Sequence, residues 1–484
     1  MNKPFSGLIA GPLIFLFIYF FIPDTIIPHQ ARAVLASTVW VALWWITEAV
    51  PIAVASLLPI VLFPLSGGLN IRATTAAYGN PLVFLFIGGF IIAMAIERWQ
   101  LHRRIALHII VWMGTATSRI ILGFMLATAL LSMWISNTAT TLMMMPIGLS
   151  VVRQLQQTAD KKGGVEPVFG KALMLSIAYA ASIGGMATLI GTPTNVIFSA
   201  MVKQLLNYEI TFASWFVFAF PLSVLLLVLG WLYLVRVAFP LRYDVVSGGN
   251  ERIRARLEAM GPVKVQEKKV LIVFTLTALA WMGRSFILAP LFPDINDTII
   301  ALNGALLLFI IPSGKGRGHR LLFWEDAVKL PWGIILLFGG GLALAAGFKE
   351  SGLALWLGER MHGLHVLPYA LLILIVVASV NFLTEITSNV ATASVILPVL
   401  AAMARAMGSP PLELMAAATI AASCAFMLPV ATPPNAVVFG SGEITMGDMV
   451  RTGLRMNLIS IGVEGIYVLV ILPWLWGTLS ARLF

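Results

Sequence analysis

The sequence predicts an all-α polytopic membrane protein, built as an inverted repeat with two re-entrant hairpins and two broken helices. Of the 484 residues, 59% are hydrophobic and only 11% are charged, a composition that needs lipid rather than water as its solvent. Polar Ser-Asn motifs interrupt two long apolar stretches, one in each half of the chain. Each stretch is followed by a second apolar run that proline interrupts, so the two halves are expected to share one plan.

The composition also excludes several classes of protein. The net charge of +10 does not indicate nucleic-acid binding, because the basic residues fall in loops between apolar spans, where orientation in a membrane accounts for them. Cys424 is the only cysteine, so an intramolecular disulfide is impossible, and the six histidines show no metal-ligand spacing. Segment 7–22 is not followed by a clean cleavage site, so we expect a retained first helix. The lipid bilayer is an expected partner, and nucleic acid is not.

Membrane spans are expected wherever a long apolar run lies between charged loops. In chain order these are 7–22, 32–46, 52–65, 81–96, 212–235, 270–288, 298–311, 331–347 and 454–474. The longest polar segment, 236–269, is expected to be a solvated cytoplasmic linker with a short interfacial helix at 250–258. Segments 98–119 and 349–367 are only moderately apolar and precede the two hairpins, so we expect interfacial arms that carry them.

The first hairpin is centred on Ser136, Asn137 and Thr138. Between Ile120 and Val152 the chain has no Asp, Glu, Lys, Arg or His. As one helix this stretch would be about 50 Å long, whereas the hydrocarbon core of a bilayer is about 30 Å thick. We therefore expect two arms that turn near the middle of the membrane. Non-helical backbone at that depth must lie within protein or line a water-filled cavity, so the turn is a candidate binding site.

The second half repeats these features in the same order. The motif that begins at Ser388 matches the one that begins at Ser136, and in both a proline follows ten residues after the serine. The proline breaks at 191–195 and 431–435 also correspond. Paired interruptions at corresponding positions of two halves are the best indication of a transporter's substrate site that a sequence offers.

The distribution of basic residues predicts the orientation of the two halves. With the N-terminus inside and both hairpins re-entrant, most of the 31 Lys and Arg residues fall on the cytoplasmic side, as the positive-inside rule requires. The ends of the first hairpin then lie in the cytoplasm and the ends of the second lie outside. The halves are therefore expected to be inverted relative to each other.

The residue types at the tips and breaks favour a carboxylate together with a hard cation. Asn and Thr side chains and exposed helix N-termini suit a carboxylate, whereas Ser and Asn oxygens and freed carbonyl groups suit Na⁺. Neither hairpin contains Lys, Arg or His, so co-bound cations are the expected source of compensating charge. The alternative is that these residues only cap helix ends, which two matching copies disfavour.

Two carboxylates near these motifs are interpreted separately. Glu385 lies three residues before Ser388 and is either a functional group or a structural one that pairs with a backbone donor or a neighbour. Glu48 lies at a predicted cytoplasmic junction, where a capping role is expected.

These motifs together resemble those of the divalent anion/sodium symporter family over nearly the whole chain. The resemblance rests on the segment from Thr47 to Pro59, both Ser-Asn tips and both proline breaks. It implies Na⁺ sites at Ser132, Ser136, Asn137 and Gly185 and at Thr384, Thr387, Asn389 and Ala431. It implies substrate contacts from Asn137, Thr138, Ser388, Asn389, Thr432 and Pro433. The sequence departs from the family pattern at Val390, where threonine is expected, so one hydroxyl donor is missing.

The resemblance also implies a homodimer in which each protomer has a scaffold domain and a transport domain that moves as an elevator. The two halves of the transport domain are expected at 119–211 and 368–453, each with a hairpin and a broken helix. Scaffold helices and the first arm are expected at 1–118, scaffold helices, linker and second arm at 212–367, and the last helix at 454–484.

The sequence thus predicts a sodium-coupled importer of dicarboxylates of the succinate, malate and fumarate type in the inner membrane, and not an enzyme. The alternatives are a sodium-independent dicarboxylate exchanger of the same fold or a member that prefers citrate or sulfate. A membrane hydrolase would need a Ser/His pair, an Asp pair or a His-Glu motif on its intramembrane helices, and none is visible. A Na⁺/H⁺ antiporter should have titratable carboxylates at its helix breaks, and 191–195 and 431–435 have none.

Overall fold

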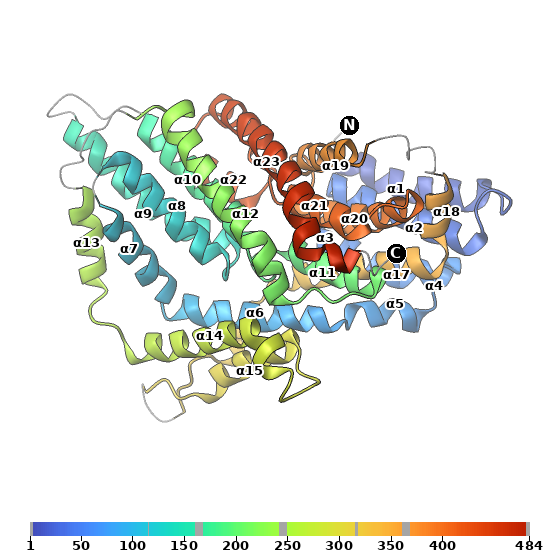
Figure 1. Ribbon diagram of the computed structural model, residues 1–484, viewed down its shortest axis with the longest axis horizontal. Coiled ribbons are helices and arrows are strands. Elements are labelled where there is room, and N and C mark those ends of the chain that lie inside the picture. The colour runs from blue at the N-terminus through green and yellow to red at the C-terminus, as the bar shows by residue number, and fades with distance from the viewer. Residues whose placement is uncertain are drawn as a thin grey trace.

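The computed structural model describes residues 3–114, 116–159, 168–241, 249–314, 318–360 and 368–480, and within these ranges every regular element is a helix (Figure 1). Seven of the described helical segments are long and apolar enough to cross a membrane, and several shorter apolar helices accompany them. The prediction of an all-α, multi-pass membrane protein is confirmed.

The described part of the first half contains twelve α-helices. They are α1 (Lys3–Phe21), α2 (His29–Thr47), α3 (Ile52–Ala55), α4 (Leu58–Ser66), α5 (Ile71–Tyr78), α6 (Pro81–Arg98), α7 (Leu101–Met113), α8 (Thr117–Ser132), α9 (Asn137–Ala159), α10 (Val168–Gly185), α11 (Pro193–Leu206) and α12 (Phe212–Tyr233). The span expected at 52–65 is broken into α3 and α4. At this break the Ser56 hydroxyl donates to the Ile52 carbonyl, and the Ser56 carbonyl accepts from the Tyr78 phenol of α5.

The second half begins with the linker and ends with the longest helix. Its elements are η1 (Leu234–Ala238), α13 (Gly249–Ala259), α14 (Val265–Gly283), η2 (Arg284–Leu288), α15 (Asp297–Ile310), α16 (Trp324–Ala327), α17 (Trp332–Glu350), α18 (Leu353–Arg360), α19 (Tyr369–Thr384), α20 (Asn389–Ala406), α21 (Pro411–Ala421), α22 (Pro433–Phe439) and α23 (Met446–Ser480). The helix α13 forms where a short helix is expected in the linker. Residues 361–367 of the expected second arm lie outside the described residues.

Both expected hairpins are present as pairs of helices that contact each other, α8 with α9 and α19 with α20. Their first arms, α8 and α19, have 16 residues each, so each is only about 24 Å long. The second arms begin at Asn137 and Asn389, the asparagines of the two matching motifs. An arm of this length is shorter than the roughly 30 Å hydrocarbon core of a bilayer.

The broken helices of each half pack against the hairpin of the other half. The short helix α22 contacts α9, and α11 contacts α20. The two breaks also touch directly, because the hydroxyl oxygens of Thr194 and Ser423 lie 3.0 Å apart. The ring of Tyr179 on α10 packs against that of Phe426, with centroids 4.9 Å apart. The two halves therefore form a single packed core around the breaks.

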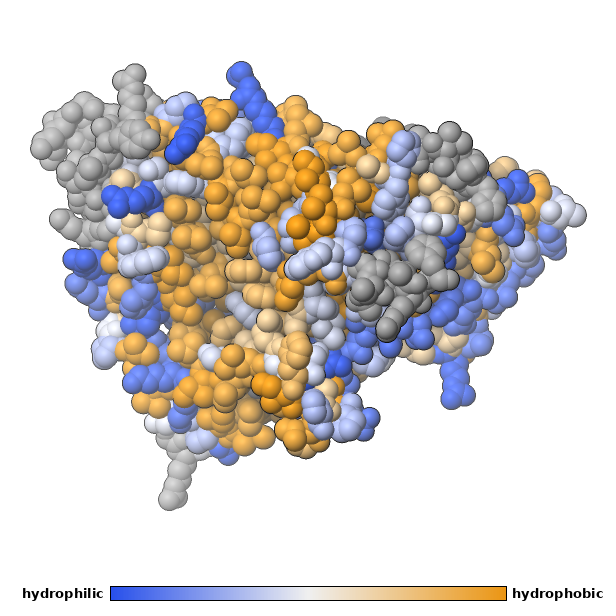
Figure 2. All heavy atoms as spheres, in the orientation of Figure 1, coloured by the Kyte–Doolittle hydropathy of each residue, from blue (hydrophilic) through white to orange (hydrophobic). Residues whose placement is uncertain are grey.

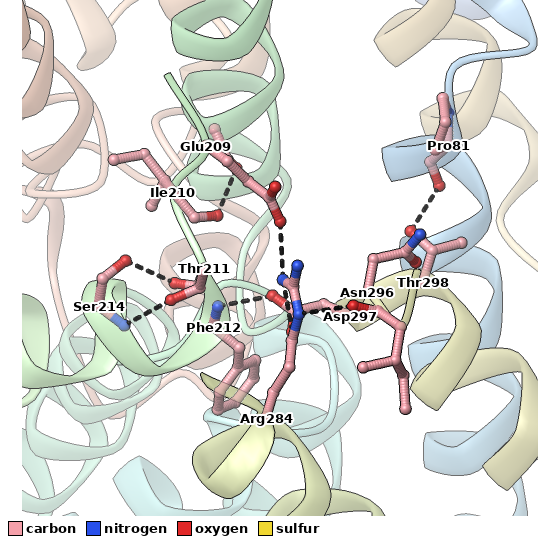
Figure 3. A network of polar contacts seen from close by, with 12 residues as sticks. Pro81, Glu209, Ile210, Thr211, Phe212, Ser214, Arg284, Asn296, Asp297 and Thr298 are labelled. Atoms are coloured by element: carbon pink, nitrogen blue, oxygen red, sulfur yellow. Dashed lines mark hydrogen bonds and ion pairs between the residues drawn. The ribbon is translucent and has the colours of Figure 1, made fainter. Parts of the chain in front are cut away.

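A polar network, drawn in Figure 3, holds the start of α12 against η2 and α15. The Arg284 guanidinium lies 2.7 Å from a carboxylate oxygen of Glu209 and 3.3 Å from one of Asp297. The other Asp297 oxygen accepts a 2.7 Å hydrogen bond from the backbone N–H of Phe212. These contacts fix the point at which the chain passes from α11 to α12.

Apolar side chains cover much of the face shown in Figure 2, over α12, α14, α15 and α23, and hydrophilic residues gather near its left and right margins. Many large apolar side chains of these helices are exposed, among them Leu276, Leu279, Ile310, Ile466 and Trp474. An apolar surface of this extent is unsuited to water and suited to the interior of a bilayer.

Candidate functional site

Three oxygen atoms converge at the tip of the first hairpin. The hydroxyl oxygen of Ser132, at the end of α8, lies 2.6 Å from Oδ1 of Asn137 and 2.7 Å from the carbonyl oxygen of Ala181 on α10. A serine hydroxyl has one proton, so it can donate to only one of these two acceptors at a time. Ser132 is fully buried, so bulk water does not compensate for the missing donor. This excess of acceptor oxygens is the chemistry that a small hard cation satisfies.

The second hairpin builds the same arrangement from corresponding elements. The hydroxyl oxygen of Thr384, at the end of α19, lies 2.6 Å from Oδ1 of Asn389 and 3.1 Å from the carbonyl oxygen of Ala422, just after α21. Thr384 is fully buried, as Ser132 is. We call the set Ser132, Asn137 and Ala181 the first oxygen cluster and the set Thr384, Asn389 and Ala422 the second oxygen cluster.

Two glycines allow the backbone to approach the first oxygen cluster closely. A Cβ atom on Gly185 would lie 2.4 Å from Oδ1 of Asn137, and one on Gly191 would lie 2.3 Å from the carbonyl oxygen of Gly185. Neither position has room for a side chain unless the surrounding backbone or Asn137 moves. The space that a Cβ would fill and the all-oxygen ligand set both fit Na⁺. Within the described ranges, no group of His, Cys, Asp and Glu side chains is arranged to hold a metal ion.

The helices α9, α20 and α22 begin at the two tips and at the second break. The residues that are partly exposed there include Asn137 and Thr138 at the start of α9 and Ser388 and Asn389 at the start of α20. Pro433, the first residue of α22, is exposed. Free N–H groups and the partial positive charge of a helix N-terminus favour an anion such as a carboxylate.

Some of the predicted residues also cap these helices. The Ser136 hydroxyl accepts a hydrogen bond from the backbone N–H of Ala139, and the buried Thr432 hydroxyl accepts one from the N–H of Asn435. These contacts match the capping alternative for Ser136 and Thr432. They do not account for the clusters, in which Ser132 and Thr384 contact oxygen atoms and no backbone N–H.

Two of the predicted cation ligands lie outside the hydrogen-bonded part of the second oxygen cluster. The Thr387 hydroxyl lies 2.8 Å from the Leu383 carbonyl and 2.6 Å from the Thr392 hydroxyl, so its contacts are within its own hairpin. The N–H of Ala431 donates to the carbonyl of Leu428. The structure instead brings the carbonyl of Ala422 to Thr384.

Sequence reasoning missed two asparagines that shape the breaks. The side-chain amide of Asn195 donates to the carbonyls of Met186 and Thr188, at 3.1 and 2.7 Å. The amide of Asn435 donates in the same way to the carbonyls of Ala425 and Leu428, at 3.2 and 3.0 Å. Both side chains are fully buried and lie in or next to a break. The available signal was their shared position two residues after the first proline of each break.

The structure decides between the two interpretations of Glu385 in favour of the structural one. Its carboxylate accepts hydrogen bonds of 2.8 to 2.9 Å from the backbone N–H groups of Phe426, Met427 and Leu428, and one of 2.7 Å from the amide of Asn457. Four donors satisfy a buried carboxylate, which here holds the second break in place. Glu48 is exposed and follows the last residue of α2 with a φ of 49°, which is a helix-terminating conformation.

A cavity of about 170 Å³ lies between the α6–α7 junction and the first hairpin. On the hairpin side it is lined by apolar residues and by Thr140, and on the other side by Glu97, Gln100 and His102. Burial lowers the pKa of His102, whose Nδ1 donates to the Ile96 carbonyl at 3.1 Å. The cavity runs beside the residues that flank the first tip, Ile135 and Ala139.

Comparisons with known proteins agree with this geometry. Residues 4–481 match the family described as the sodium:sulfate symporter transmembrane region. The chain is 46% identical to the sodium-dependent dicarboxylate transporter SdcS of Staphylococcus aureus strain USA300, over 98% of this chain and 94% of that protein. It is also 46% identical to SdcS of Staphylococcus saprophyticus, over 97% and 92%.

Two solved structures share the fold at low sequence identity. One is the YdaH transporter of Alcanivorax borkumensis, with a TM-score of 0.58 and 16% identity over 82% of this chain and 86% of that one. The other is MtrF of Neisseria gonorrhoeae, described with a class of antimetabolite efflux pumps, with a TM-score of 0.56 and 12% identity over 96% and 97%. At these identities the likeness concerns the fold alone.

Proposed function

Because this chain belongs to the sodium:sulfate symporter family, we propose that it is a sodium-coupled symporter that imports dicarboxylates of the succinate, malate and fumarate type. SdcS is a sodium-dependent dicarboxylate transporter, which supports both the cation and the substrate class. Members of such a family move solutes and are not enzymes.

The observation that carries the proposal is the pair of oxygen clusters. Each contains a buried hydroxyl between two acceptor oxygens, and each stands at the N-terminus of a hairpin arm. We assign one Na⁺ to each cluster, with Ser132, Asn137 and the Ala181 carbonyl as ligands in the first and Thr384, Asn389 and the Ala422 carbonyl in the second. Ser136, Gly185 and Ala431 remain proposed ligands from the family pattern, whereas we leave Thr387 out of the second site because its hydroxyl bonds within its own hairpin.

Charge balance explains why the substrate and the cations would bind together. A dicarboxylate brings two negative charges into the membrane, where even one charged side chain costs about 2.5–3.5 kcal/mol on insertion scales. Each helix N-terminus supplies only about half a charge, so the starts of α9 and α20 offset roughly one of the two. The hairpins have no Lys, Arg or His between Ile120 and Val152 or between Tyr369 and Ala404. Bound Na⁺ supplies the remainder, and the substrate would contact Asn137, Thr138, Ser388, Asn389, Thr432 and Pro433.

The larger assembly is proposed on the same basis. The two halves form an inverted repeat in the inner membrane, the transport domain comprises 119–211 and 368–453, and the protein is a homodimer that works by an elevator motion. The contacts of α22 with α9 and of α11 with α20 support a transport domain that moves as one body. A cysteine introduced at Pro410, in a variant lacking Cys424, should be labelled only from outside, and labelling from inside would contradict the inverted orientation.

The function is tested by uptake of labelled succinate into proteoliposomes. An inward Na⁺ gradient should drive accumulation that rises cooperatively with Na⁺ concentration, and replacement of Na⁺ by choline should abolish it. Unlabelled malate and fumarate should compete, and sulfate and citrate should be compared at the same concentrations. Robust exchange of succinate in choline buffer would overturn the symporter and support the sodium-independent exchanger.

A further inference from the structure

The helix α23 carries a fully buried carboxylate that no described residue neutralises. Glu464 has no solvent exposure, and neither of its carboxylate oxygens has a hydrogen-bond partner among the described residues. The backbone N–H of Ala421 lies near it but does not meet the geometry of a hydrogen bond. No ion pair in the described part of the chain includes Glu464. An isolated ionised carboxylate in such a place is so costly that the group takes up a proton or another cation.

A third unpartnered oxygen belongs to Asn381, which contacts α23 near Glu464. The amide of Asn381 on α19 donates to the Cys424 carbonyl at 2.6 Å and to the Ser460 hydroxyl at 3.4 Å, which fixes its orientation. Its Oδ1 atom is buried and has no partner among the described residues. Ser460 lies one turn before Glu464 on the same face of α23, and Cys424 is close enough to Glu464 to interact with it electrostatically. Three unpartnered oxygens thus lie beside Cys424.

Glu385 is a buried carboxylate with a structural role, and its contacts differ from those of Glu464. That carboxylate receives three backbone donors and the amide of Asn457, another residue of α23. Glu464 stands two turns further along the same helix and receives no such donors. Burial therefore does not explain why Glu464 lacks hydrogen-bond donors. A cation or proton that binds to Glu464 and exchanges does explain it.

We propose that Glu464 and Asn381 form an additional cation site, which holds a proton when Na⁺ is scarce and exchanges it for Na⁺ when Na⁺ is abundant. In the exchange the carboxylic acid releases its proton to the solution, and the resulting carboxylate pairs with the incoming Na⁺. The site is neutral in both states. Its ligands are oxygen atoms, which suit Na⁺, and the same carboxylate is the only group in the site that can hold a proton.

The position of this site links it to the second oxygen cluster. Asn381 lies one turn before Thr384 on α19, and Cys424 is two residues after Ala422. A cation beside Glu464 and a cation at the second oxygen cluster would therefore share the backbone between α21 and the second break. When a cation occupies one of these two sites, the shared backbone is expected to adopt the arrangement that also binds a cation at the other site.

Most of the other titratable groups near α23 already have partners among the described residues. Glu385 is saturated by its donors, and the phenol of Tyr233 donates to the Thr452 carbonyl. The phenol of Tyr369 donates to Glu413, and these two lie toward the opposite ends of α19 and α21 from the Glu464 site. The Cys424 thiol is the titratable group next to Glu464. The phenol of Tyr179 packs against Phe426 and has no partner among the described residues.

The test measures proton release from the purified protein in weakly buffered detergent solution without any dicarboxylate. NaCl is added, choline chloride serves as the ionic-strength control, and a pH indicator reports the protons. Wild-type protein should release a proton as Na⁺ binds in at least part of a series of starting pH values from about 5 to about 9. Glu464→Gln, which is neutral and similar in shape, should lose this release. Glu413→Gln and Cys424→Ser should keep it.

Two results would overturn the proposal. One is the absence of Na⁺-induced release from wild-type protein over that pH range, which needs no variant to fold. The other is undiminished release from folded Glu464→Gln. Because succinate is absent, the outcome does not depend on the proposed transport function, which fails separately if the wild type shows no Na⁺-driven uptake.

Discussion

Replacement of Thr384 by valine tests the second oxygen cluster with little change in side-chain shape. The substitution removes the hydroxyl that lies between Asn389 and Ala422 and leaves their two oxygens in place. A polar contact to a charged partner contributes about 1.5–3 kcal/mol. At about 1.4 kcal/mol for each factor of ten, the half-saturating Na⁺ concentration should rise roughly 10- to 150-fold. The maximal rate at saturating Na⁺ should change much less.

Thr387→Val is the matched control, because the resemblance assigns Thr387 to the same Na⁺ and the structure directs its hydroxyl elsewhere. Its contacts with Leu383 and Thr392 lie within the hairpin, so its loss should lower stability by about 1 kcal/mol without moving the Na⁺ midpoint. The midpoint is read from uptake and, independently, from the Na⁺-dependent rise in melting temperature. An unchanged Na⁺ midpoint in Thr384→Val, or an equal shift in Thr387→Val, would refute the assignment of Na⁺ to the second oxygen cluster.

Three further substitutions probe other parts of the site. Gly185→Ala should abolish Na⁺-dependent uptake in folded, monodisperse protein, because the added Cβ would lie 2.4 Å from Oδ1 of Asn137 and force that side chain to move. Normal uptake by this variant would show that Gly185 is not part of the Na⁺ site. Glu385→Gln should lower the melting temperature by several degrees through loss of charge-assisted bonds worth about 1.5–3 kcal/mol each, whereas an unchanged melting temperature would contradict its structural role. Val390→Thr should change the ranking of competing dicarboxylates in the uptake assay, and identical ranking would show that this partly exposed side chain points away from the substrate.

Much of the fold could be predicted because lipid demands long apolar helices. The span expected at 298–311 is α15 (Asp297–Ile310), and the one at 331–347 lies within α17. The break between α3 and α4 was not predicted; Pro59 stands at the start of α4, and the Ser56 carbonyl at the break accepts a hydrogen bond from Tyr78 of another helix. Hydropathy registers an apolar run but not a contact that bends it.

The site could be predicted only where a side chain carries the chemistry. Asn137 and Asn389 stand out as polar residues of two matching motifs in apolar surroundings, whereas Ser132 and Thr384 were predicted from the resemblance to the family. The carbonyls of Ala181 and Ala422 complete the clusters, and alanine gives no sign of this, since every residue has a carbonyl group.

The packing between the halves explains why the two clusters should act together. Each oxygen cluster includes a carbonyl from the broken helix of its own half, that of Ala181 or Ala422. After the break, each broken helix packs on the hairpin of the other half, α11 on α20 and α22 on α9. The Thr194–Ser423 contact joins the breaks themselves. A displacement of one hairpin therefore has to carry both breaks with it, or else separate buried, close-packed surfaces at a large cost in free energy. If the hairpins move as an elevator, the substrate and the cations at both clusters are expected to move as one cargo.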